Sequence, residues 1–150
     1  MSREVQTKIA QVRAYLKAQK LDGAVFLSRS NFAWLSGGGD NHIVSQDGAG
    51  VGALVVTRRQ ALVVANRIEL GRLTAEEGLD DFTPKVFPWI QGMGDFLKKT
   101  LPKGRYAADT PGLGFDGLPG DFSNTIRCEL QDAEIRRYKA LGRDCALVVE

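Results

Sequence analysis

Residues 51–65 read Val-Gly-Ala-Leu-Val-Val-Thr-Arg-Arg-Gln-Ala-Leu-Val-Val-Ala, two apolar runs separated by three polar residues. Runs of this length, rich in β-branched residues, predict strands over 51–57 and 61–65, and the short polar connection predicts a hairpin between them. Neither run alternates apolar with polar residues, which is typical of a sheet covered on both faces. The pair therefore predicts an α/β fold in which helices flank a sheet.

The segment before this hairpin supplies a helix and a strand. Val5, Ile9, Val12 and Leu16 follow one another at spacings of four, three and four, which places them on one helical face, and the charged residues between them are expected to be exposed. Asp22-Gly23 marks the end of this helix, and the short apolar run at 24–27 predicts a buried strand.

A second apolar run, 32–35, predicts another strand, on which Phe32 and Trp34 would point to opposite faces. Residues 36–52 are dominated by Gly, Ser, Asp and Asn and predict a long loop. Loops of this length are uncommon in compact domains and are often functional.

The rest of the chain alternates between helical and extended patterns. Pro84 and Pro88 confine the strand-like segment that holds them to the edge of the sheet. The predicted elements after the hairpin are a helix over 68–77, an edge strand over 82–89, a helix over 94–100, a strand over 105–109, a Gly- and Pro-rich loop over 110–120, a strand over 125–130 and a helix over 131–150. This order predicts a mixed β-sheet flanked by helices.

Length and composition indicate one soluble domain. The 150 residues are 43% hydrophobic, and 20 Lys and Arg against 18 Asp and Glu give a net charge of +2, too small to indicate nucleic acid or an anionic membrane as a partner. No apolar run approaches the roughly 20 residues of a membrane span, and the first residues lack the apolar core of a secretory signal. We therefore expect a cytoplasmic protein in which Cys128 and Cys145 are reduced thiols.

The chain offers little for catalysis. His42 is its only histidine, and the three residues that could bind zinc, His42, Cys128 and Cys145, lie far apart in sequence. The glycines of 48–52 precede a strand rather than opening a helix, so they fit a phosphate-binding loop poorly. We expect no catalytic and no metal-binding residue in this chain.

Several segments in order resemble the amino-terminal domain of the creatinase/prolidase/Xaa-Pro aminopeptidase family. The resemblance lies in the opening helix, in Leu21-Asp22-Gly23-Ala24-Val25-Phe26, in Asn31-Phe32-Ala33-Trp34-Leu35-Ser36-Gly37, and in two apolar strands that end near Arg67. Trp34 stands where the family has Tyr, Ser36 where it has Thr, and Asn66-Arg67-Ile68-Glu69 keeps only the arginine of the usual Asp-x-Arg-Tyr.

Residues 126–138 resemble the segment with which this family leaves the domain, an arginine-bearing strand that leads to a Glu-Ile-x-x-hydrophobic helix. Glu134-Ile135 matches that helix, whereas 130–133 replaces the usual Lys-Ser-Pro. The final helix also lacks a glycine, a proline or a basic last turn at its end, which indicates that it continues.

The resemblance implies a ribonuclease-H-like α/β fold of the creatinase N-terminal type over 1–130, with 131–150 as the start of a linker helix. The linker would lead to a carboxy-terminal catalytic domain absent from this chain, in which two divalent metal ions (Mn, Co or Zn) activate water for amide hydrolysis.

The function implied is that of the non-catalytic part of a metal-dependent Xaa-Pro aminopeptidase or dipeptidase. It would support a homodimer and shape the active-site entrance through which the parent enzyme receives peptides. The residues expected at this entrance are Asn31, Trp34, Ser36, Gly37, His42 and Arg67. Two alternatives stay open at this point: an interaction module of a metal-free pseudo-peptidase, and a nucleotide-binding α/β domain.

Overall fold

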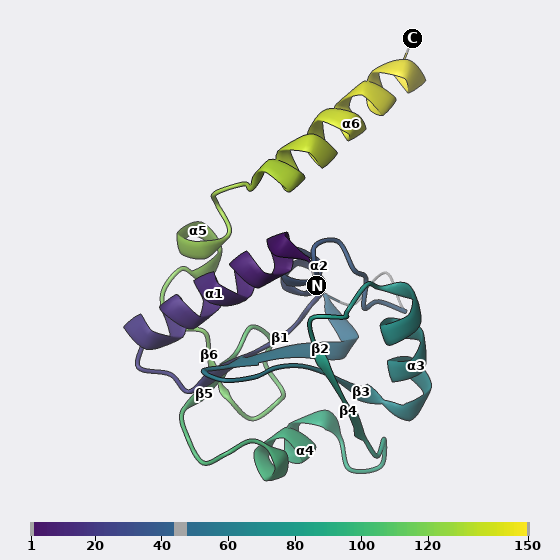
Figure 1. The fold of residues 1–150 in the computed structure, drawn as a ribbon. Helices are drawn as coiled ribbons and strands as arrows, with labels where there is room; N and C mark the ends of the chain where they lie inside the picture. The colour runs from purple at the N-terminus through teal and green to yellow at the C-terminus, as the bar shows by residue number, and fades with distance from the viewer. Residues whose placement is uncertain (1, 44–47, 150) are drawn as a thin grey trace.

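A computed structural model describes residues 2–43 and 48–149 and shows one six-stranded sheet with helices on both faces (Figure 1). The elements are α1 (Arg3–Ala18), β1 (Gly23–Ser28), α2 (Arg29–Ser36), β2 (Ala49–Thr57), β3 (Ala61–Asn66), α3 (Arg67–Glu76), β4 (Thr83–Phe87), α4 (Met93–Thr100), β5 (Tyr106–Ala108), β6 (Asp116–Gly117), α5 (Phe122–Ile126) and α6 (Asp132–Val149). The predicted mixed sheet with flanking helices is confirmed.

Strand order in the sheet is β4-β3-β2-β1-β5-β6. β2 pairs antiparallel with β1 and β3, and the other pairings, β1 with β5, β5 with β6 and β3 with β4, are parallel. All strands except β2 therefore point the same way. We call the sheet edge at which these five strands end the carboxyl edge, and the opposite one the amino edge.

The hairpin that predicted the fold forms as expected. Thr57 and Ala61 flank its turn, with Val56 opposite Ala61 and Gly52 opposite Ala65. Its apolar residues alternate between two cores, so that Leu54 and Val63 face one side while Val55 and Val64 face the other. Both faces are buried, which explains why neither strand carries a polar face.

Four helices cover one face and a single helix covers the other. The larger core joins the sheet to α1, α2, α3 and α5; its helical members include Val12, Leu35, Leu73 and Phe122. The smaller core lies under α4 and includes Leu97 and Leu101.

Two predicted strands, over 32–35 and over 125–130, do not form. Residues 32–35 belong to α2, in which Phe32 and Leu35, three positions apart, are fully buried in the larger core together with Trp34. Phe32 and Trp34 therefore share one core and do not lie on opposite faces of a sheet. The Ser28 side chain caps the helix by accepting from the Asn31 backbone N–H, and Gly37 ends it with φ at +80°.

The strand predicted over 125–130 is likewise wrong. Asp121 caps α5 by accepting from the Asn124 backbone N–H, and Phe122 anchors this short helix in the larger core. Local capping and one buried aromatic thus outweigh the alternation of Ile126, Cys128 and Leu130 with charged Arg127 and Glu129, the pattern that predicted a strand.

The long loop predicted over 36–52 is shorter at both ends, since Ser36 belongs to α2 and β2 begins at Ala49; residues 44–47 of this prediction lie outside the described part of the chain. The loop over 110–120 contains the two-residue strand β6.

Cys128 and Cys145 are exposed free thiols. Within the described residues, no helix has the length and apolarity needed to cross a bilayer.

Phe122 connects α5 to the body, since its ring contacts those of Tyr15, Phe26 and Trp34 with centroids 5.0–6.0 Å apart. The change Phe122→Ala is predicted to lower the free energy of unfolding by about 3–5 kcal/mol, because it opens a cavity in the larger core. Urea denaturation measures the loss. Trp89→Ala, at a ring that is 76% exposed, is the control and should change stability by no more than about 0.5 kcal/mol.

Candidate functional site

The residues expected at an active-site entrance all lie along the carboxyl edge. Asn31, Trp34 and Ser36 belong to α2, which directly follows β1, and Arg67 opens α3, which directly follows β3. His42 lies in the connection to β2, the one strand that starts at this edge. The carboxyl ends of strands are where open α/β sheets usually bind ligands.

Asp109 organises the centre of this edge. Its carboxylate accepts hydrogen bonds from the backbone N–H of Leu27 at 2.8 Å, the Ser28 hydroxyl at 2.5 Å and the Asn31 amide at 2.8 Å. The Asn31 amide oxygen accepts in turn from the Arg127 guanidinium at 2.8 Å. Asn31 is thus held between an anion and a cation and connects α2 to the segment after α5.

Trp34 and Ser36 also have internal partners. The Trp34 ring is 8% exposed and its carbonyl accepts from the Lys8 ammonium at 2.7 Å. The Ser36 hydroxyl donates to the Phe32 carbonyl at 2.8 Å and accepts from the Gly39 N–H at 2.9 Å, which shapes the turn after α2 around Gly37. These contacts position the loop rather than offering the two side chains to a ligand.

His42 and Arg67 are more accessible. The His42 imidazole contacts the Asp40 carboxylate, and the Asp40 N–H donates to the Glu77 carboxylate at 2.7 Å, which ties this loop to the end of α3. Partial burial of Asp40 opposes its ionisation, but the hydrogen bonds from His42 outweigh it and lower the pKa of the Asp40 carboxyl. Arg67 is exposed and makes no hydrogen bond or ion pair with the described residues.

The glycines of 48–52 allow close packing at the same edge. A Cβ on Gly50 would lie 2.0 Å from the Asn41 amide nitrogen, and one on Gly52 would lie 2.5 Å from a Leu73 methyl group. Asn41 is fully buried and donates to the carbonyls of Leu27 and Gly52, so it joins the end of β1 to the beginning of β2. Gly50 thus makes room for that amide, and Gly52 makes room for Leu73.

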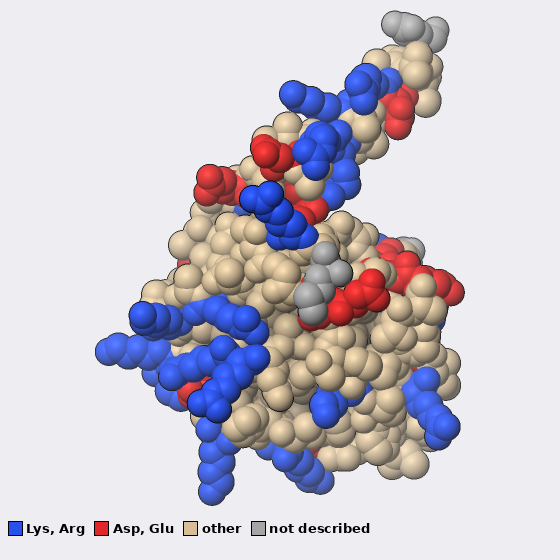
Figure 2. Space-filling view, in the orientation of Figure 1, with Lys and Arg blue, Asp and Glu red and all other residues tan. Residues whose placement is uncertain are grey.

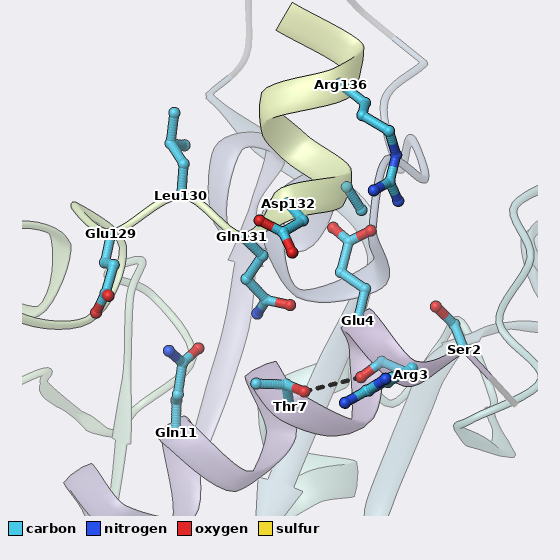
Figure 3. A pocket seen from close by; sticks show the side chains of 11 residues that line it. Ser2, Arg3, Glu4, Thr7, Gln11, Glu129, Leu130, Gln131, Asp132 and Arg136 are labelled. Atoms are coloured by element: carbon cyan, nitrogen blue, oxygen red, sulfur yellow. Dashed lines mark hydrogen bonds between the residues drawn. The ribbon is translucent and has the colours of Figure 1, made fainter.

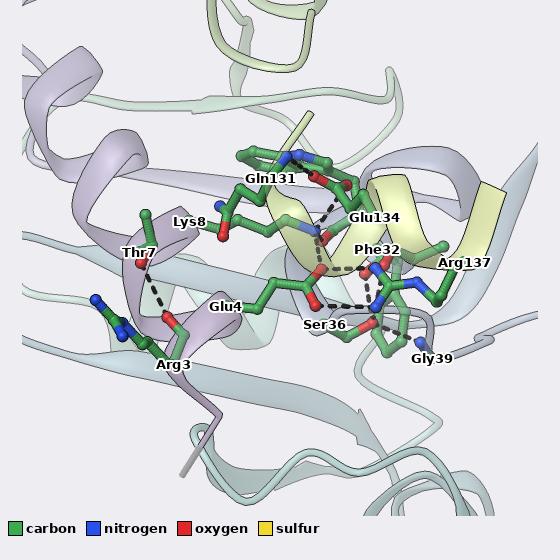
Figure 4. Close-up of polar contacts among 12 residues, drawn as sticks. Arg3, Glu4, Thr7, Lys8, Phe32, Ser36, Gly39, Gln131, Glu134 and Arg137 are labelled. Carbon is green, nitrogen blue, oxygen red and sulfur yellow. Dashed lines mark hydrogen bonds and ion pairs between the residues drawn. The ribbon is translucent and has the colours of Figure 1, made fainter. Parts of the chain in front are cut away.

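The charged residues of the first helix were expected to be exposed, and this is wrong for Lys8, which is 1% exposed. Its ammonium donates to Glu4 at 2.7 Å, to the Trp34 carbonyl at 2.7 Å and to Glu134 at 3.0 Å (Figure 4). Three acceptors match the three N–H donors of the ammonium, and the Trp34 ring lies beneath it at 5.5 Å. The acceptors come from α1, α2 and α6, which meet at this one charge.

A second contact reinforces the attachment of α6. Arg137 donates through two guanidinium nitrogens to the two carboxylate oxygens of Glu4, at 2.9 and 2.7 Å. The hydrogen bond from Arg137, with the one from Lys8, lowers the pKa of Glu4 from 4.5 to about 2 against the opposing effect of burial. Glu134 also accepts from the Gln131 N–H at 3.0 Å and so caps the start of α6.

Beyond these contacts α6 projects away from the body (Figure 1) and exposes apolar side chains. Tyr138 is 63% and Leu141 57% exposed, and Val148 is 86% exposed. The first two line a groove of about 370 Å³ beside Ala33 and Gly38, which we call the α2–α6 groove. It brings α6 next to the turn that precedes His42.

The groove on the other side of α6 is polar rather than apolar. A groove of about 720 Å³ runs between the first turns of α1 and the segment leading into α6, and its lining is largely polar and charged (Figure 3). Arg3, Asp132 and Arg136 are among its residues. Throughout residues 2–43 and 48–149, no three side chains of His, Cys, Asp or Glu are grouped so that they could hold a metal ion.

Sequence reasoning did not identify Lys8, Glu4, Arg137 or Asp109 as important. Asp109 was detectable as an acid at the carboxyl end of a predicted strand, and Glu134 as part of the Glu-Ile motif. Lys8 and Glu4 gave no signal, because an i,i+4 pair of opposite charge is usually a solvated one.

The mixed sheet, the polar residues at its carboxyl edge and the anchored final helix define an α/β domain. Residues 8–145 match the family model of the Creatinase/Prolidase N-terminal domain, and the chain belongs to this family. No curated protein matches the sequence significantly.

Solved structures share the fold. Dipeptidase PepE from Mycobacterium ulcerans is similar with a TM-score of 0.67 and 16% identity over 89% of this chain and 39% of its own. A proline dipeptidase from Streptococcus pneumoniae has a TM-score of 0.57 and 20% identity over 86% of this chain and 100% of the solved one. The Xaa-Pro dipeptidase from Bacillus anthracis has a TM-score of 0.59 and 11% identity over 88% of this chain and 38% of its own. The chain thus spans about two fifths of the longer of these proteins.

Protonation of Glu4 is predicted to weaken the attachment of α6. The folded-state pKa of about 2 lies below the ordinary 4.5, so the stability that Glu4 adds is present above about pH 4.5 and is lost as the pH falls toward 2. Glu4→Gln should therefore be less stable than the unchanged chain near neutral pH, with a gap that closes on acidification. Urea midpoints across this range measure it, with exposed Glu76→Gln as control; a gap that is constant with pH would contradict the assignment.

Proposed function

We propose that this chain is the non-catalytic N-terminal domain of a metal-dependent Xaa-Pro peptidase, and that it works by holding and orienting a catalytic domain. Membership of the Creatinase/Prolidase N-terminal family supports this, as do neighbours that are named Xaa-Pro or proline dipeptidases. The observation that carries the proposal is that α6 is fixed at its base and exposes a stripe of apolar side chains beyond it.

The base of α6 determines where the rest of the helix points. Glu134 and Arg137 lie one turn apart and contact Lys8 and Glu4 of α1, so the helix can neither rotate nor slide without leaving buried charges unpaired. Tyr138 and Leu141 then line the α2–α6 groove, and Val148, which is 86% exposed, lies in the last turn of the projecting helix. Contiguous exposed apolar residues are typical of a docking surface, and the partner proposed is a C-terminal catalytic domain.

The two divalent ions (Mn, Co or Zn) of such an enzyme would belong to that catalytic domain. The described residues of this chain offer no group of ligands that fits a metal ion, so we assign no metal-binding step to them. Bound in the catalytic domain, two metal ions would activate water and polarise the amide.

We further propose that the turn after α2 forms part of the active-site entrance, within a homodimer. His42 and Arg67 have the exposure that contact with a peptide requires, and the α2–α6 groove lies beside the same turn. Asn31, Trp34 and Ser36 are buried, so their part is to hold the turn in place, and Gly37 supplies its positive φ.

Activity assays on the complete reading frame and on residues 1–150 alone test the proposal. The complete protein should hydrolyse Xaa-Pro dipeptides with Mn²⁺ and lose this activity with a chelator, whereas residues 1–150 should be inactive under both conditions. Cleavage by residues 1–150 in the presence of chelator would overturn the proposal, as would a complete protein that has no metal-dependent activity.

In the complete enzyme, His42→Ala and Arg67→Ala are predicted to raise KM about three- to tenfold, because each removes a polar contact from the entrance worth about 1 kcal/mol. Exposed Lys85→Ala is the matched control and should leave KM unchanged. Circular dichroism checks that each variant folds. Unchanged KM and kcat in both variants would remove these residues from the entrance.

A further inference from the structure

The amino edge of the sheet, remote from the entrance residues, brings three segments together around Asp22. Its backbone N–H donates to the Arg105 carbonyl at 2.7 Å, and its carbonyl accepts from the Arg58 N–H at 3.3 Å. Its carboxylate accepts from the Arg105 N–H at 2.9 Å and pairs with the Arg58 guanidinium at 3.2 Å. The end of α1, the β2–β3 turn and the loop before β5 therefore form one surface.

This surface is strongly basic although the whole chain carries only +2. The segments 13–22, 57–60 and 102–106 contain a single acid, Asp22. Their cations are Arg13, Lys17, Lys20, Arg58, Arg59, Lys103 and Arg105, which we call the basic patch. In Figure 2 the blue side chains gather at the lower left, at the end of the sheet opposite the projecting α6.

Most of these cations have no partner within residues 2–43 and 48–149. The guanidinium of Arg59 and the ammonium groups of Lys17, Lys20 and Lys103 make no ion pair or hydrogen bond with described residues, and all four residues are exposed. Like charges held close together without counterions repel one another, so a bound anion would be stabilised here.

A groove of about 370 Å³ runs through the basic patch, between Arg58 and Arg59 on one wall and Lys103 on the other. Pro102 and Tyr106 add apolar surface to it, and Gln60 adds an amide. We propose that this groove binds an extended acidic polypeptide segment, whose carboxylates pair with the cations while its backbone lies along Pro102 and Tyr106.

The lining favours a peptide over other polyanions. The Asp22 carboxylate and the Gln60 amide lie in the groove, where their oxygens can accept hydrogen bonds from the backbone N–H groups of a peptide, donors that a row of phosphates lacks. One half-buried tyrosine offers no series of stacking rings for nucleic acid bases. A membrane surface would require exposed apolar side chains, whereas Leu21 and Leu101 are 4% and 8% exposed.

Fluorescence anisotropy with a fluorescein-labelled octaglutamate peptide tests the proposal on the purified chain. Binding should weaken at least tenfold when salt is raised from low to above physiological strength, because the contacts are exposed ion pairs. The triple change Lys17→Glu, Arg59→Glu and Lys103→Glu should weaken it about tenfold or more. Lys85→Glu, Lys139→Glu and Arg143→Glu reverse the same charge at exposed sites elsewhere and should retain most of the binding.

Competition by an oligothymidylate of equal charge and by phosphatidylserine vesicles completes the experiment. The oligothymidylate and the vesicles should each displace the labelled peptide less effectively than unlabelled octaglutamate does. Absence of peptide binding, equal loss in the two triple variants, or stronger binding of the oligonucleotide or vesicles would overturn it.

Discussion

The buried ammonium of Lys8 is the contact on which the arrangement of three helices depends. It is 1% exposed, and its three hydrogen bonds go to α1, to the carbonyl of Trp34 in α2 and to Glu134 at the start of α6. Removing a charge from water costs several kcal/mol unless every donor is paired, so only a geometry that supplies all three acceptors is stable. This requirement fixes α6 against the body, and the bidentate pair between Arg137 and Glu4 extends the attachment by one turn.

The same constraint links the turn after α2 to the start of α6. Because Trp34 belongs to the helix that ends at the Gly37 turn, the ammonium that orients α6 also holds the base of the turn carrying Asp40 and His42. In the proposed enzyme, a catalytic domain docked along Tyr138 and Leu141 would therefore lie at a fixed distance from this turn. The basic patch lies at the opposite edge of the sheet, so an acidic segment could bind there without reaching either feature.

The sequence predicted the strands correctly where a long apolar run or a proline restricted the possible structures. The hairpin of β2 and β3, the buried β1 and the edge strand β4 were all predicted, because continuous apolar runs and prolines constrain strands directly. Residues 32–35 were predicted as a strand because a short apolar run does not distinguish strand from helix, and the cap from Ser28 decides for the helix. Residues 125–130 were predicted as a strand because apolar and charged residues alternate there, but the cap from Asp121 starts a helix that ends at Ile126. The family motif led to Asn31, Trp34 and Ser36 as entrance residues but gave no sign of their burial. Lys8 could not be recognised, since its acceptor Glu134 is 126 residues away in sequence.

The central claim is that the Lys8 ammonium holds α6, and hydrogen exchange of the α6 amides tests it most directly. In Lys8→Met the Glu134 carboxylate and the Trp34 carbonyl lose their buried donor, at a cost of about 3 kcal/mol. Exchange of the amides of residues 136–141 should then accelerate by roughly a hundredfold, while amides of β2 and β3 change much less. Exposed Lys17→Met serves as the control. If exchange in α6 is the same in Lys8→Met as in the unchanged chain, the helix is held by something other than this charge.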